Sequence, residues 1–342
     1  MYSYDKYHLK NGRCSNHGTM LVTFHIYSAE IPIVEKYQRR LADWDQKASV
    51  RKSPPRYLCA EEAQGKLYFM PEVVPVSQHP ALVARDLSAT LLIEHLYTYL
   101  NFTTVLEHDV INAVAQQIAQ GQLAVDLPQD MRIDAFKVYC DEGYHALFCA
   151  HLISQVEIIT GIPFRPRALP PFLRHLRGLQ SSVAQEFPQM AELCFAVVSE
   201  TLITQTLART AKDARVVGAV RHIMADHAQD EARHYAYFSN VFEIIWPQLS
   251  PREQETVGPL LPQFILGFLE PDLLTLANLL ALYGLPADTI QDVLDECYPA
   301  AQVLADAKAA AQTTLRLFTR CGVLEEPQTA EAFYASGLIN AN

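Results

Sequence analysis

Apolar residues recur at helical spacing through most of the chain from residue 81 onward. Long stretches without proline place apolar side chains three and four positions apart, and glycine or proline separates one stretch from the next. This pattern predicts four long helices, with approximate bounds at 82–120, 129–160, 189–211 and 216–246. Residues 162–189 contain several prolines and no clear pattern, so we expect a long connection there that holds a short helix.

Four long helices with one long connection in the middle are typical of ferritin-like proteins. Further helices are predicted beyond residue 250, at 251–269, 271–283, 287–297 and 300–321. The expected fold class is therefore all-α, a ferritin-like four-helix bundle with a long central crossover and additional C-terminal helices.

Residues 1–80 lack this regularity and contain scattered prolines. Within them, residues 22–27 and 66–70 have the composition of short strands. We expect residues 1–80 to form an irregular N-terminal extension that packs on the bundle. Residues 81–342 are expected to form the bundle with its C-terminal helices, so that the whole chain is one domain.

The chain has 342 residues, of which 50% are hydrophobic, and a formal net charge of −11. The excess of acidic residues argues against nucleic acid or an anionic membrane as the main partner, because both attract clustered Lys and Arg. The most apolar stretch, residues 273–285, is too short to span a bilayer, and residues 1–13 are too polar for a secretory signal. We therefore expect a cytoplasmic protein.

Seven cysteines are scattered along the chain without a CxxC pair. This distribution argues against both a disulfide framework and a thiolate zinc site, and it fits a reducing compartment. Cys140, Cys149 and Cys194 lie in apolar helical patterns, so we expect them to be small core residues.

Two segments of the form Asp-Glu-x-x-His carry the candidate chemistry. One is Asp141, Glu142 and His145 on the second predicted helix, and the other is Asp230, Glu231 and His234 on the fourth. Residues three apart on a helix differ by about 60° in direction, so each glutamate and histidine can reach one metal ion. Such a pair on each of two helices, with a single glutamate from each of two others, is the pattern of di-iron and di-manganese carboxylate proteins.

Hairpin geometry selects the two single glutamates. Glu107 lies 18 residues before a joint expected near residue 125, and Glu142 lies 17 residues beyond it. Glu94 is 31 residues before that joint, which places it roughly 20 Å out of the layer at 1.5 Å per residue. On the third helix, Glu200 fits the layer of Glu231, and Glu192 is a reserve.

Three further features complete the predicted site. His227 precedes Glu231 by four residues and shares its helix face, so it adds a third imidazole. Metal-bound histidines usually donate their second ring N–H to a carboxylate, so we expect Asp141 to contact His234 and Asp230 to contact His145. The first motif is flanked by Phe136, Val138, Tyr139, Leu147 and Phe148, and carboxylates buried among such residues would be costly without a metal.

Other polar residues near the motifs fit other roles. The best interpretation of four further histidines is core or surface packing, for His95, His108, His151 and His222. Four tyrosines lie near the motifs in sequence, where either core packing or a radical or proton-donor role is open, for Tyr97, Tyr99, Tyr144 and Tyr235.

The predicted ligand set resembles the seven-ligand di-iron site of the p-aminobenzoate N-oxygenase family. The set consists of Glu107, Glu142, His145, Glu200, His227, Glu231 and His234, and the resemblance covers roughly residues 85–245. It implies an oxidoreductase that uses O2 and external electrons to oxidise a primary amine, either an arylamine or an aminoacyl group, to a hydroxylamine, nitroso or nitro product. The di-iron centre itself would be the catalytic group, and no substrate-binding residue is assigned.

The ligand chemistry is consistent with this resemblance. Carboxylates and imidazoles suit two iron ions better than copper or structural zinc, and manganese stays open. The chain lacks a flavin or dinucleotide glycine motif, so we expect a separate electron donor. The other expected partners are a small-molecule or carrier-tethered amine and, as an option, a second copy of the chain in a homodimer.

Three rival functions use related sites. A di-iron C–H hydroxylase or desaturase would share the scaffold. A ribonucleotide reductase small subunit would need a radical tyrosine and lacks the His227 ligand in its usual six-ligand pattern. A non-enzymatic metal-binding or storage protein belongs to a different class, and its chains are usually shorter.

Overall fold

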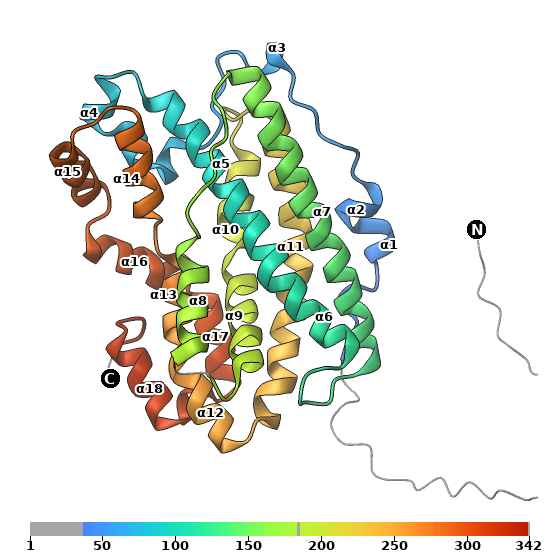
Figure 1. Cartoon of the computed structure of the whole chain (residues 1–342). Coiled ribbons are helices and arrows are strands. Elements are labelled where there is room, and N and C mark those ends of the chain that lie inside the picture. Colours follow the sequence, from blue (N-terminus) through green and yellow to red (C-terminus); the bar gives the residue numbers. More distant parts are fainter. Residues whose placement is uncertain (1–36, 183–184, 341–342) are drawn as a thin grey trace, which may run out of the picture. The chain divides into compact units, whose positions relative to one another are not determined.

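The computed structural model describes residues 37–182 and 185–340. Four long helical segments form the bundle (Figure 1). The first segment consists of α5 (Ser88–Leu106), a π-helical turn η4 (Glu107–Ile111) and α6 (Asn112–Gln120). The other three are α7 (Gln129–Thr160), the pair α9 (Pro188–Leu202) and α10 (Thr204–Lys212), and α11 (Gly218–Ile245).

The bundle is made of two helical hairpins. Helices α5 and α6 pack along α7, helices α9 and α10 pack along α11, and α7 contacts α11 between the hairpins. The central crossover runs from the end of α7 to the start of α9 and contains α8 (Pro171–Ser182). The predicted all-α, ferritin-like bundle with a long crossover is therefore confirmed.

The helix ends follow local backbone chemistry. Gly121 and Gly161 end α6 and α7 in the left-handed conformation, with φ of 66° and 69°, which glycine adopts without steric cost. The predicted joints near residues 125 and 213 fall in the two hairpin loops.

Four predicted helices are interrupted, among them 251–269, which a 3-10 turn at Gly258–Leu260 divides. The first begins at Ser88 instead of residue 82, because Asp86 has a φ of 58° and separates α5 from the short α4 (Pro80–Val83). The third breaks after Leu202, and the stretch 300–321 divides at Ala311. Apolar periodicity continues across these breaks, so it did not reveal them.

The N-terminal segment from residue 37 is built of short helical turns. They are α1 (Trp44–Lys47), α2 (Ser49–Lys52), α3 (Ala60–Ala63), η2 (Pro71–Val73) and η3 (Pro75–Gln78). The expected strand at 66–70 is wrong, because Leu67 forms only an isolated bridge with Val216, and α11 begins two residues later at Gly218. The expected strand at 22–27 lies outside the described residues.

The C-terminal helices pack against the crossover side of the bundle. They are α12 (Pro251–Val257), η6 (Gly258–Leu260), α13 (Leu261–Leu269), α14 (Leu273–Leu282), α15 (Ala287–Cys297), α16 (Ala300–Ala310), α17 (Gln312–Arg320), η7 (Val323–Glu325) and α18 (Pro327–Ala335). Helix α13 contacts both α8 and α9. Phe264 of α13 packs edge-on against Phe195 of α9, and Phe195 stacks on Phe172 of α8. The last helix, α18, was not predicted.

Among the described residues, two helical stretches are long and apolar enough to cross a membrane by length and composition alone. The stretch Pro188–Lys212 is 88% buried inside the protein, as expected of a core helix. The stretch Pro251–Leu282 is 33% buried and combines several short helices. Core helices of globular proteins pass the same test, so these stretches are weak evidence for a membrane span.

The expected apolar surroundings of the first motif are only partly buried. Val138 and Phe148 lie in the core. Phe136, Tyr139 and Leu147 are exposed, and Cys140 is exposed as well, so the expectation that they are internal is wrong. The reason is that the inner face of α7 is occupied by the acidic and histidine side chains.

A buried ion pair joins the bundle to the crossover. Glu94 on α5 is fully buried, and its carboxylate accepts hydrogen bonds from Arg167 at 2.5 Å and from the Tyr283 hydroxyl at 2.6 Å. Arg165 approaches the same carboxylate at 3.4 Å. Glu94 therefore connects α5 with the crossover and the end of α14.

Replacing Arg167 with alanine should destabilise the fold. Arg167→Ala leaves the buried Glu94 carboxylate without its principal cation, so we expect the free energy of unfolding to fall by about 3 kcal/mol in chemical denaturation. Arg215→Ala is the matched control, because Arg215 pairs with Glu72 and Asp213 at the surface, and its loss should have little effect. Equal losses in the two variants would contradict this role for Glu94.

Candidate metal centre

The structure brings all seven predicted side chains together in the middle of the bundle. Each is at most 1% exposed. They come from four helical segments: Glu107 from η4, Glu142 and His145 from α7, Glu200 from α9, and His227, Glu231 and His234 from α11.

The seven residues form two groups that share Glu231. In the first group, one donor atom each from Glu107, His145, His227 and Glu231 lies within 4.8 Å of the others. The Nε2 atom of His227 is 2.9 Å from a Glu107 oxygen and 3.1 Å from a Glu231 oxygen. A single cation could therefore be shared by these donors.

The second group contains Glu142, Glu200, Glu231 and His234, again with donor atoms within 4.8 Å of one another. The Nδ1 atom of His234 is 2.8 Å from a Glu142 oxygen and 3.3 Å from a Glu231 oxygen. Glu200 is more distant, at 4.0 Å from the same nitrogen. The arrangement therefore contains two adjacent candidate positions for a metal ion.

The two aspartates contact the histidines of the opposite hairpin, as expected. Asp141 is 3.1 Å from Nε2 of His234, and Asp230 is 3.1 Å from Nε2 of His145. A carboxylate on Nε2 favours the tautomer that leaves Nδ1 as an acceptor. Both Nδ1 atoms lie beside the central carboxylates, so the aspartates orient both rings toward the centre.

Residues that the sequence did not indicate hold these aspartates in turn. The Trp44 indole donates a hydrogen bond to Asp141 at 2.9 Å. The Ser49 backbone N–H donates to Asp230 at 3.2 Å, and its hydroxyl also bonds Asp230. These partners are 97 and 181 positions away along the chain, and no motif in the N-terminal segment marks them.

The unpaired polar atoms of the cluster test whether a metal fits. Within the described residues, both oxygens of Glu107, one oxygen of Glu200 and Nδ1 of His234 are buried without a hydrogen bond of good geometry, although Glu107 and His234 each have an oppositely charged or polar neighbour within 3 Å. Burial raises the pKa of Glu107 to about 7, and burial with the nearby Glu231 and Glu142 charges raises the pKa of Glu200 well above its usual value. Buried, unpaired donors of this kind are costly, and divalent cations would compensate them.

Helix irregularities lie next to both single glutamates. A π-helical turn begins at Glu107, and α9 ends two residues after Glu200. π-helical turns occur often at functional sites because they re-aim side chains within a helix. Ideal α-helical counting placed Glu107 in the correct layer, but it gave no sign of this turn.

The glutamates and histidines that the sequence analysis did not choose as metal ligands lie outside the cluster. Glu94 is engaged with the crossover arginines, and Glu192 accepts a hydrogen bond from Gln117 at 3.2 Å. His108, His151 and His222 are exposed. The structure therefore separates these residues from the seven that converge.

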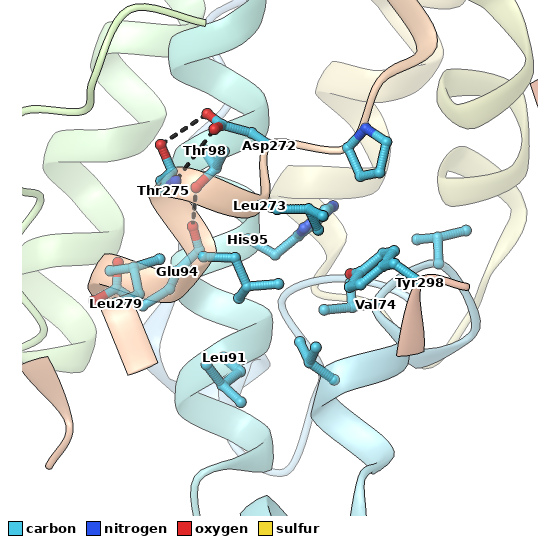
Figure 2. Close-up of a pocket in the computed structure, with 14 residues that line it drawn as sticks. Val74, Leu91, Glu94, His95, Thr98, Asp272, Leu273, Thr275, Leu279 and Tyr298 are labelled. Atoms are coloured by element: carbon cyan, nitrogen blue, oxygen red, sulfur yellow. Dashed lines mark hydrogen bonds between the residues drawn. The ribbon is translucent and has the colours of Figure 1, made fainter. Parts of the chain in front are cut away.

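Two adjoining cavities lie beside α5. One, of about 170 Å³, lies between α5, α14 and the η2–η3 turns (Figure 2). The other, of about 260 Å³, lies between α5, the crossover and α13, and both include His95, Thr98 and Asp272. The larger cavity also includes Leu202 and therefore reaches the end of α9, two residues beyond Glu200.

Tyr99 links the larger cavity to the cluster. Its side chain lines that cavity, and its buried hydroxyl has no hydrogen-bond partner among the described residues. Burial raises the pKa of Tyr99 well above its usual value, and the nearby Glu107 and Glu231 charges add to the increase. Of the four tyrosines left open by the sequence, Tyr99 lines this cavity, and Tyr144 lines a separate cavity beside Phe148.

The family model described as p-aminobenzoate N-oxygenase AurF matches residues 35–322. The chain belongs to this family. The match includes all seven clustered residues, and it extends beyond the region of the sequence resemblance to the N-terminal segment that carries Trp44 and Ser49 and to most C-terminal helices. No curated protein matches the chain. Membership of this N-oxygenase family indicates that the chain is an oxygenase acting on amines.

Metal binding should depend on Glu107 and not on Glu94. After anaerobic loading with Fe(II), we expect metal analysis to give one ion for each of the two groups in the wild-type chain. Glu107→Ala removes a donor from the first group and should lower the metal content. Glu94→Gln is the control, because it removes the charge of a buried carboxylate on the same helix outside the cluster and keeps an oxygen to accept the Arg167 hydrogen bond. A normal metal content in Glu107→Ala would contradict this ligand set.

Proposed function

We propose that this chain is a non-haem di-iron oxygenase that N-oxygenates a primary amine with O2 and external electrons. The observation that carries the proposal is the pair of buried donor groups sharing Glu231, in a chain that belongs to the N-oxygenase family. Glu107, His145 and His227 would hold one iron ion. Glu142, Glu200 and His234 would hold the other, and Glu231 would lie between them.

The charges of the site support two divalent ions. Four carboxylates carry four negative charges when ionised, and the three imidazoles are neutral as ligands, so two Fe(II) ions give a neutral site. When bound, the two ions would supply the chemistry that reduces O2 and transfers oxygen to nitrogen. Manganese has ligand preferences similar to those of iron, so metal analysis has to distinguish iron from manganese.

The lining of the larger cavity favours an aromatic amine. Its walls carry Tyr99, Phe102, Phe172 and Phe268, which offer ring faces and edges to a flat substrate. Burial lowers the pKa of His95 to about 4, so this imidazole is neutral near pH 7. The Arg167 guanidinium of this cavity already forms an ion pair with Glu94.

The acidic residues of this cavity also have partners. Asp272 accepts hydrogen bonds from Thr275 at the start of α14, and Glu270 pairs with His175. An alkylammonium group would therefore have to compete with existing contacts for a counter-ion, whereas an arylamine is largely neutral at pH 7. We accordingly propose an arylamine over an aminoacyl group.

Tyr99 is the residue that we assign to substrate positioning. Its hydroxyl can donate a hydrogen bond to the neutral amine nitrogen, or accept one from the amine N–H, at the end of the cavity nearest the carboxylates. Such a contact would hold the nitrogen lone pair in a defined direction. The surrounding rings would exclude water from the same space.

The function is tested by substrate turnover. The Fe(II)-loaded chain is supplied with O2 and a chemical reductant, and arylamines are compared with aminoacyl thioesters by mass spectrometry. We expect oxygen to be added to the nitrogen of arylamines. Oxygen addition to carbon, or desaturation, would support the C–H hydroxylase or desaturase alternative. Iron uptake without oxidation of any substrate would support a storage role.

His227 should be needed for N-oxygenation and less for folding. His227→Ala removes one imidazole but leaves six donors to bind metal, so we expect a folded helical protein in which amine oxidation per bound iron falls sharply. The matched control is His222→Ala, which changes an exposed histidine on the same helix. An unchanged ratio of oxidation to bound iron in His227→Ala would show that His227 is not a functional ligand.

A further inference from the structure

Trp44 lies at the outer end of a hydrogen-bonded path to the candidate metal centre. Its indole Nε1 donates to one Asp141 oxygen at 2.9 Å, and the other Asp141 oxygen is 3.1 Å from Nε2 of His234. The Nδ1 atom of the same imidazole lies beside Glu142 and Glu231. Two contacts of hydrogen-bond length therefore join a half-buried indole to a candidate metal ligand.

The other hairpin has a corresponding path that lacks an aromatic end. Asp230 is 3.1 Å from Nε2 of His145, and Ser49 takes the place of the indole on that aspartate. Ser49 is buried, and a hydroxyl does not exchange electrons at biological potentials. An indole ring is one of the few side chains that does. Both aspartates orient a histidine, but of these two paths the one through Asp141 ends in a redox-active ring.

A cation lies over the Trp44 ring. The guanidinium carbon of Arg51 is 5.5 Å from the ring centre. A guanidinium in this position is attracted to the negative face of the ring, and it would repel the positive charge of an oxidised indole. The contact therefore disfavours a long-lived tryptophan radical. This environment suits a ring that passes electrons inward and does not store an oxidising equivalent.

The surface segment around Trp44 is basic, although the chain as a whole carries a net charge of −11. Residues 37–56 contain six basic and two acidic residues, and both acidic residues are paired with a cation of the same segment. The exposed basic residues are Arg39, Arg40, Lys47, Arg51 and Lys52. A negatively charged partner would be attracted to this segment and repelled by the acidic remainder of the chain, which would orient the partner toward Trp44.

We propose that residues 37–56 are the docking surface for an acidic one-electron redox protein and that its electrons enter through Trp44. Figure 1 shows α1 and α2 beside α7, and α2 contacts both α7 and α11. In each transfer the donor loses one electron and one Fe(III) ion becomes Fe(II). Trp44 is unchanged at the end, and two transfers reduce both ions. The inference rests on the proposed function, because it requires a centre that consumes external electrons.

The rate of iron reduction tests the path through Trp44. The Fe(III)-loaded chain is mixed anaerobically, without amine, with a reduced plant-type ferredoxin as the acidic donor, and the loss of Fe(III) absorbance is followed. Trp44→Phe keeps a ring but removes the N–H that bonds Asp141, so reduction should slow about tenfold. Trp246→Phe is the matched control, because this buried tryptophan lies outside residues 37–56. Dithionite, which is small enough to enter the cavities, should reduce both variants at the wild-type rate.

Docking is measured separately on the metal-free chain. The chain contains two tryptophans, so Trp44 is the only source of its indole fluorescence in the Trp246→Phe variant. Titration of this variant with the ferredoxin should quench the fluorescence to saturation, because the iron–sulfur cluster absorbs at the wavelength of the emission. The apparent dissociation constant should rise steeply with ionic strength, since the contact is between opposite charges.

Charge reversal locates the docking surface. Arg40→Glu combined with Lys52→Glu should weaken ferredoxin binding to the metal-free chain about tenfold. Arg316→Glu combined with Lys212→Glu is the matched control, because it changes the net charge equally at exposed positions outside residues 37–56. Binding should stay close to the wild-type value in this control pair.

Four results would overturn the proposal. Equal slowing of ferredoxin and dithionite in Trp44→Phe would show that the indole only holds the centre in shape. An unchanged ferredoxin rate in that variant would place electron entry elsewhere. Equal weakening by the two charge-reversed pairs, or no binding at all, would exclude residues 37–56 as the docking surface for an acidic donor. None of these measurements uses amine oxidation, so they are independent of the turnover test of the proposed function.

Discussion

The burial of four glutamates at one level of the bundle is the constraint on which the rest of the structure depends. Carboxylates at 1% exposure or less cannot be solvated by water, and the three imidazoles, two of which are themselves bonded to the buried aspartates, supply only part of the compensation. In each of the two groups the donor oxygen and nitrogen atoms lie within 4.8 Å of one another, so one cation could contact all of them. Helix pairing, the crossed aspartate–histidine contacts and the support from Trp44 and Ser49 all serve to keep these groups converged.

The same constraint explains the unusual distribution of residues on α7. Its inner face carries Asp134, Asp141, Glu142 and His145, which leaves apolar residues such as Phe136 to the outside. The inner face of the helix therefore mixes these polar groups with apolar residues such as Leu152 and Val156, and its outer face exposes apolar residues where an ordinary surface helix carries charged ones. The N-terminal segment is also part of the centre in a functional sense, because it supplies hydrogen bonds to both aspartates.

The sequence was sufficient for the architecture and for the convergence of the seven residues, because helix periodicity and hairpin counting are local rules. Glu107 was separated from Glu94 by its distance from one turn, and the structure places Glu94 in a different contact. The sequence was insufficient where contacts are remote or where periodicity is ambiguous. Ser49 meets Asp230 across 181 positions, and the periodicity around Phe136 and Cys140 indicated helix but not which face was buried.

The ion pair and hydrogen bonds of Glu94 have a consequence for which parts of this fold can vary in sequence. The larger cavity beside α5 has walls from α5, the α9–α10 junction, the crossover and the α13–α14 junction, none of which belongs to α7 or α11. Glu94 fastens these outer walls to the bundle through Arg167 and Tyr283. Substitutions in the outer walls can therefore reshape the cavity while the paired motifs of α7 and α11 stay the same. Relatives that share this metal centre but act on different amines are expected to differ mainly in the residues of these outer walls.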